Sequence, residues 1–81
     1  MNTRVYHFSL TPDDFVYNRQ DCNNYCKLNI PGLSVYDKVD IGVYKSLYSF
    51  NTIIKQDTLY LVARMKPYKV IRIRIVVTKA Y

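Results

Sequence analysis

An alternation of isoleucine and arginine near the end of the chain constrains the fold more than any other feature. Isoleucine stands at positions 71, 73 and 75, and arginine at positions 72 and 74. Successive side chains of a β-strand point to opposite faces, so this segment predicts a strand with its isoleucines in a core and its arginines in water. A chain of 81 residues can bury one thin core. We therefore expect a single domain over residues 1–81.

A second apolar segment precedes this strand and predicts a C-terminal β-hairpin. Thr58–Met65 and Lys69–Thr78 are separated only by residues 66–68, a spacing typical of antiparallel strands joined by a short turn. Two registers are open, and they differ by one residue. We favour the register that keeps arginine out of the core, because burying an unpaired guanidinium is costly. It gives one exposed face that carries Tyr60, Arg64, Arg72 and Arg74.

The first half of the chain predicts a strand followed by a short helix. Thr3–Leu10 alternates, with its more apolar side chains at even positions. The residues Thr11-Pro12-Asp13-Asp14 that follow are typical of a helix start: threonine as N-cap, proline in the first turn, and two carboxylates near the positive end of the helix dipole. We expect this helix to end between Arg19 and Cys22, because the asparagines beyond weaken it.

Further strands are predicted at residues 25–30 and 39–47, with a turn at Pro31-Gly32 between them and a connection over residues 51–57. The expected fold class is therefore α+β. It comprises a small, mostly antiparallel sheet of four or five strands, one short helix after the first strand, and the C-terminal hairpin.

The charges of the chain are distributed very unevenly. All six acidic residues lie at or before Asp57, while the segment after it contains six basic residues. Residues 1–57 contain the other six basic residues and are neutral overall, so the formal net charge of +6 comes from residues 58–81. This asymmetry predicts a partner of opposite charge.

Residues suited to catalysis or metal binding are few, and we predict no enzyme, no cofactor and no metal. His7 is the only histidine and is interpreted as a structural residue of the first strand. Cys22 and Cys26 could join His7 in a zinc site, with Asp21 or a second subunit as the fourth ligand, but the second closely spaced pair of ligands is missing. We expect both cysteines to be free thiols.

Two functions remain open. The first is nucleic-acid binding, DNA or RNA, through Tyr60, Arg64, Arg72 and Arg74, because guanidinium groups bind phosphates and tyrosine rings stack on bases. The second is a protein-binding module or inhibitor that engages an acidic surface of a host protein, since Tyr and Arg are also common in protein interfaces. The arginines could equally be the solvated side of an amphipathic strand, but a face that is merely solvated usually mixes both charges.

The chain is expected to act in a cytoplasm, because it has neither a secretory leader nor an apolar run long enough to span a membrane. A homodimer is suggested by the long final strand, whose free edge could pair with a second copy.

Residues 7–15 and 35–39 resemble the strand, helix and barrel entry of small PUA-like RNA-binding domains. Tyr36 replaces the usual glycine there, and the basic pattern after the helix is missing, so no site is carried across. In composition, the Tyr- and Ile-rich chain resembles small accessory proteins of viruses of microbes.

Overall fold

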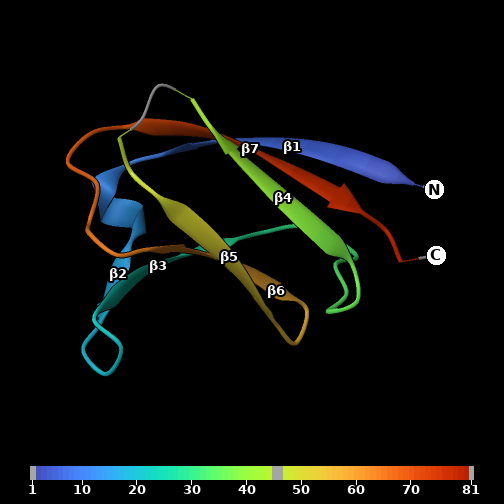
Figure 1. Ribbon diagram of the computed structural model, residues 1–81, viewed down its shortest axis with the longest axis horizontal. Helices are drawn as coiled ribbons and strands as arrows, with labels where there is room; N and C mark the ends of the chain where they lie inside the picture. The colour runs from blue at the N-terminus through green and yellow to red at the C-terminus, as the bar shows by residue number, and fades with distance from the viewer. Residues whose placement is uncertain (1, 45–46, 81) are drawn as a thin grey trace.

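The computed structural model describes residues 2–44 and 47–80, and these form two antiparallel β-sheets (Figure 1). The three-stranded sheet has the order β1-β7-β4, and the four-stranded sheet has the order β2-β3-β6-β5. The strands are β1 Thr3–Leu10, β2 Val16–Asn18, β3 Asn23–Leu28, β4 Lys38–Val43, β5 Phe50–Lys55, β6 Thr58–Ala63 and β7 Ile71–Thr78. The predicted α+β class is wrong, because the regular structure of the described residues consists of strands and one three-residue 3₁₀ turn.

One hydrophobic core lies between the two sheets and is supplied by alternate residues of each. β7 contributes Ile71, Ile73, Ile75 and Val77, all of them buried, and the other sheet contributes buried side chains that include Leu28, Leu59 and Leu61. The isoleucines of the alternating segment are thus confirmed as core residues. The first predicted strand is also confirmed, with β1 spanning Thr3–Leu10 and its even-numbered side chains turned toward the core.

The predicted helix is reduced to one 3₁₀ turn, η1, at Pro12–Asp14. The helix-start signal does form, since the Asp14 carboxylate accepts hydrogen bonds from the Thr11 backbone N–H at 2.7 Å and from its hydroxyl at 3.2 Å. The chain then enters β2, which pairs with β3 through a turn at residues 19–22. In that turn the Asn18 side chain accepts a hydrogen bond from the Gln20 N–H, and the Asp21 side chain accepts one from Asn23. Such side-chain bonds favour turns over helix. Among the described residues, no helical segment has the length and hydrophobicity of a membrane span.

The predicted C-terminal hairpin is also wrong, because β6 and β7 belong to different sheets. β6 pairs with β3 and β5, whereas β7 pairs with β1 and β4. The connection between β6 and β7 crosses from one sheet to the other, and Pro67 in its middle is fully buried. The apolar sides of the two strands therefore face each other across the core, and their polar sides face opposite ways.

Three smaller expectations also change. The predicted connection at residues 51–57 is mostly strand β5, joined to β6 by a tight turn at Gln56 and Asp57. The expected route to a homodimer is closed as well, because β7 is the central strand of its sheet and both of its edges are already paired. A predicted strand over residues 39–47 is confirmed only as β4, and residues 45–46 of that prediction lie outside the described chain.

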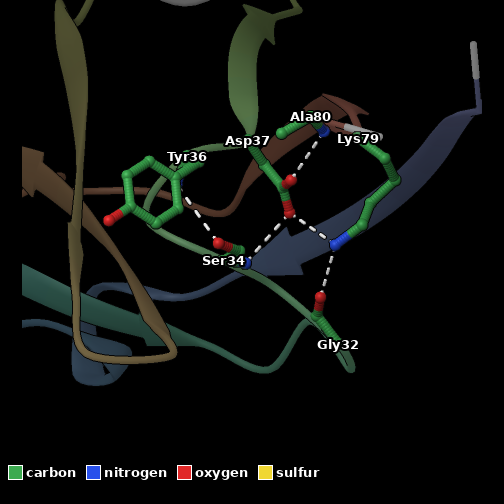
Figure 2. Close-up of polar contacts among 6 residues, drawn as sticks. All are labelled: Gly32, Ser34, Tyr36, Asp37, Lys79 and Ala80. Carbon is green, nitrogen blue, oxygen red and sulfur yellow. Dashed lines mark hydrogen bonds and ion pairs between the residues drawn. The ribbon is translucent and has the colours of Figure 1, made fainter.

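A buried carboxylate, that of Asp37, binds the chain segments at the C-terminal end of β7 (Figure 2). Asp37, just before β4, forms an ion pair with Lys79 at 2.6 Å and accepts hydrogen bonds from the backbone N–H groups of Ser34 at 2.9 Å and Ala80 at 3.0 Å. The Lys79 ammonium also donates to the Gly32 carbonyl. The hydrogen bond from Lys79 is the main cause that lowers the pKa of Asp37 below its usual value. Lys79 is therefore neutralised locally.

Candidate nucleic-acid interface

The central strand β7 places Arg72 and Arg74 side by side on the outer face of the three-stranded sheet. Both are exposed, and both alternate with the buried isoleucines. Arg74 lies between His7 of β1 and Gly42 of β4 in the strand pairing, and Arg72 lies beside Ser9 of β1. The two arginines thus have His7 and Ser9 of β1 as neighbours on one side, and these polar side chains also point outward from the sheet.

Gly42 gives Arg74 room to lie across β4. A Cβ atom built at Gly42 would stand 3.8 Å from the Arg74 Nε and 3.9 Å from its Nη2. The Arg74 guanidinium therefore lies close to the β4 backbone, at ordinary van der Waals distance from where a side chain at position 42 would begin. The Arg74 side chain is exposed and forms no ion pair within the described residues, so its N–H groups are free to donate.

The strand ladder continues one residue beyond β4, and this places Tyr44 next to Arg72. The Tyr44 N–H donates to the Arg72 carbonyl at 3.1 Å. Tyr44 and Arg72 also line an open depression of about 760 Å³ together with His7, Ser9, Lys69 and Val70. We call the residues His7, Ser9, Tyr44, Lys69, Arg72 and Arg74 the basic face.

The cations of the basic face have no carboxylate partners among the described residues. The ion pair of Lys79 with Asp37 is the one ion pair found in residues 2–44 and 47–80, and it lies at the far end of β7. One carboxylate does share the outer surface: Asp40 pairs with Val76, one row of the sheet away from Arg74, and forms no ion pair with it. Such a group of unpaired cations can donate several charge-assisted hydrogen bonds to phosphate oxygens.

The structure brings together only two of the four residues predicted for nucleic-acid binding. Arg72 and Arg74 lie in the basic face, but Tyr60 points outward from the four-stranded sheet, on the opposite side of the molecule. Arg64 is exposed in the connection that follows β6. The four residues do not share one face, because the hairpin that would have aligned them does not form.

The sequence pattern does not predict that His7, Ser9 and Lys69 lie beside the arginines. The alternation of β1 does place His7 and Ser9 on its outer side. What the sequence lacks is a signal that β1 is the strand beside β7, since the two are about 70 residues apart along the chain.

The outer side of the four-stranded sheet has a different character, and we call its residues Val16, Tyr25, Lys27, Ile53, Lys55 and Tyr60 the tyrosine face. The Tyr25 and Tyr60 rings meet edge to face, with centroids 6.3 Å apart. The Tyr25 hydroxyl donates to the Asp21 carboxylate, and this hydrogen bond is the main cause that raises the pKa of Tyr25. All six residues line a second open depression, of about 840 Å³.

The two cysteines are free thiols in unlike environments. Cys22 is exposed in the turn between β2 and β3, whereas Cys26 points into the core. Burial is the main cause that raises the pKa of Cys26 to about 11, with a smaller contribution from the charge of Asp14. Within the described part of the chain, no group of three His, Cys, Asp or Glu side chains is placed to hold a metal ion.

Comparison with models of known protein families, with characterised proteins and with solved structures finds no significant match to this chain.

Proposed function

We propose that the protein binds nucleic acid through the basic face, with Arg72 and Arg74 as the principal phosphate ligands. The observation that supports this most directly is the pair of adjacent, exposed guanidinium groups on β7 without a carboxylate partner in the described chain. Proteins normally intersperse both charges on a surface that serves only solubility. An unpaired cluster raises the local concentration of polyanions and speeds their association.

The shape of the basic face favours a polyanion over a single small anion. Arg72 and Arg74 are two residues apart on one strand, so their Cα atoms are separated by about 7 Å along it. Lys69, which precedes β7, lines the same open depression as Arg72. Several cations around an open surface suit successive phosphates of a backbone, whereas a small anion is usually held in an enclosed pocket by convergent donors.

A salt titration with a fluorescein-labelled 20-nucleotide single strand tests this proposal. The affinity should fall steeply with salt, and Arg72→Ala with Arg74→Ala should weaken binding by about tenfold or more at low salt. Loss of two phosphate contacts, at about 0.7 each, should reduce the slope of log K against log salt by about 1.4.

Lys27→Ala with Lys55→Ala is the matched control, because it removes the same charge from the tyrosine face. It should change the affinity by less than about threefold. The proposal fails if the wild-type protein does not bind at low salt, or if the two double variants weaken binding equally.

A second candidate function, recognition of an acidic surface on a host protein, is favoured by the tyrosine face. Val16 is 71% exposed and Ile53 is 38% exposed beside Tyr60, and Lys27 and Lys55 supply positive charge. Large apolar and tyrosine side chains rimmed by cations are typical of protein interfaces. If this function holds, a defined protein should be captured after nuclease treatment, and Ile53→Asp should abolish its capture while the double arginine variant retains it. The viral origin and the cytoplasmic location stay predictions.

A further inference from the structure

Two exposed tyrosine rings lie at the same end of the molecule as the basic face. Tyr44 is 59% exposed and lines the depression with Lys69 and Arg72. Tyr68 is 74% exposed, and the Lys69 ammonium lies 5.7 Å from the centroid of its ring. Lys69 therefore lies beside the Tyr68 ring and also lines the depression that contains Tyr44 and Arg72. In Figure 1 the segment after β6 and the end of β4 lie at the same end of the sandwich, away from the two chain termini.

We propose that the ligand of the basic face is single-stranded nucleic acid, with bases stacked on Tyr44 and Tyr68 while its phosphates contact Lys69, Arg72 and Arg74. This inference rests on the proposed function and specifies its substrate class. Stacking on exposed aromatic rings beside a positively charged groove is how proteins hold single strands without reading their sequence.

Tyr68 is held in position although its ring is exposed. Its backbone N–H donates to the Tyr48 hydroxyl at 2.9 Å, and the two rings meet edge to face with centroids 5.5 Å apart. Tyr48 in turn packs against the buried Phe50, with ring centroids 6.0 Å apart, and the neighbouring Pro67 is fully buried. The Tyr68 ring is thus connected to the core through Tyr48 and Phe50. A platform fixed before binding loses little conformational entropy when a base stacks on it.

Tyr44 is positioned by the sheet itself. Its N–H bond to the Arg72 carbonyl makes it the cross-strand neighbour of Arg72. Neighbouring side chains on one face of an antiparallel pair lie about 5 Å apart at their Cβ atoms. One nucleotide can therefore place its base on Tyr44 and its phosphate on Arg72 at the same time.

A duplex would make less use of this surface. Its bases are paired and stacked inside, so only the phosphates could reach the arginines and the two rings would stay exposed to water. Among residues 2–44 and 47–80, the single helical segment is the three-residue η1, which is too short to serve as a recognition helix in the major groove. The basic face would bind a duplex through its cations alone. It would bind a single strand more tightly, because the tyrosine rings would also stack on the bases.

Fluorescence anisotropy with a labelled 12-nucleotide oligo(dT) and a 12-base-pair duplex at the same low salt tests the inference. Tyr44→Leu and Tyr68→Leu should each weaken binding of the single strand by about 5- to 100-fold and leave duplex binding within about twofold. Tyr44→Phe and Tyr68→Phe should retain single-strand binding, since the ring remains.

Tyr36→Leu is the matched control, because Tyr36 is 77% exposed but lies beside the Asp37 cluster at the other end of the sheet (Figure 2). It should bind both ligands like the wild type. If the wild type binds neither ligand, the proposed function itself fails. If it binds both equally and the leucine variants change neither affinity, nucleic-acid binding stands and the single-strand inference is overturned. Circular dichroism of each variant establishes that it is folded.

Discussion

The two outer faces of the sandwich rest on the same core but differ in the side chains that they expose. On the tyrosine face, Tyr25 donates to Asp21 and packs edge to face on Tyr60. On the basic face, Arg72 and Arg74 have no carboxylate partner in the described chain, and their strand neighbours are small or uncharged residues such as Ser9 and Gly42. The tyrosine face presents tyrosine and apolar side chains with two lysines around them, whereas the basic face presents two adjacent guanidinium groups and Lys69 to an anionic partner.

The basic C-terminal segment contains both charge that is used within the fold and charge that is free to bind a ligand. Lys79 belongs to the same basic C-terminal segment as the arginines, yet it is bound by the buried Asp37. The excess of positive charge seen in the sequence is thus divided along β7: Lys79 at its end is used within the fold, while Arg72 and Arg74 near its start are available.

Among single substitutions that change the charge, the largest effect is expected from a carboxylate introduced into the basic face. Gly42→Asp places an acid next to the Arg74 guanidinium, within reach of an ion pair, and position 42 has an ordinary strand backbone that accepts a side chain. Affinity for an oligonucleotide should fall about tenfold, because one cation is neutralised and one negative charge is added.

Gly42→Asn is its matched control, with nearly the same volume and no charge. It should lower the affinity by less than about threefold, measured by the same anisotropy titration. Equal losses for the two variants would mean that bulk over β4, and not the charge beside Arg74, decides binding. The contrast between the two faces would then not be electrostatic.

A smaller effect is expected at the Asp37 cluster. The pKa of Asp37 is lower in the folded protein than in the unfolded chain, so its carboxylate contributes stability that is present above the unfolded-state pKa of about 3.9 and is lost as the pH falls through the folded value. Asp37→Asn should therefore lower the Tm at pH 7, and its difference from the wild type should shrink toward zero near pH 2.5.

Asp13→Asn, at an exposed carboxylate in η1, should leave the Tm at pH 7 nearly unchanged. Nucleic-acid affinity should also be unchanged in Asp37→Asn, because the cluster lies at the far end of β7 from Arg72. A Tm difference that stays constant between pH 7 and pH 2.5 would contradict the assigned role of the carboxylate.

The smallest effect concerns the thiols beside and beneath the tyrosine face. Cys22 is exposed, whereas Cys26 is 3% exposed and burial raises its pKa to about 11. A thiol reagent at pH 8 should modify one cysteine per folded chain quickly, and Cys22→Ser should remove this fast reaction. The modified protein should keep its nucleic-acid affinity, since the label lies on the side away from the basic face. Fast reaction of both thiols in the folded protein would show that Cys26 is not in the core.

The inward and outward sides of the strands were predictable from the sequence because alternation is a local property. Leu59 and Leu61 in β6, and Ile71, Ile73 and Ile75 in β7, are all buried as their spacing predicts. The same pattern says nothing about which strand pairs with which. Tyr60 and Arg72 each lie on the outer side of their own strand, as alternation predicts. They face opposite sides of the molecule because β6 and β7 lie in different sheets.

The helix was predicted wrongly for a different reason. The signal at Thr11–Asp14 was correct for one turn, but the asparagine and aspartate side chains of residues 18–21 bond to nearby backbone N–H groups and form a turn. The basic face could be predicted only as far as Arg72 and Arg74, since its remaining members come from β1, from the end of β4 and from the crossing connection. These parts meet only after the sheets are assembled.

Mapping the backbone amide signals of isotope-labelled protein by NMR during titration with an unlabelled oligonucleotide tests the central claim most directly. If the basic face is the binding site, the shifts should concentrate in β1 and the first half of β7, and at Tyr44, Tyr68 and Lys69. Shifts concentrated in β3, β5 and β6 would place the ligand on the tyrosine face and contradict the account.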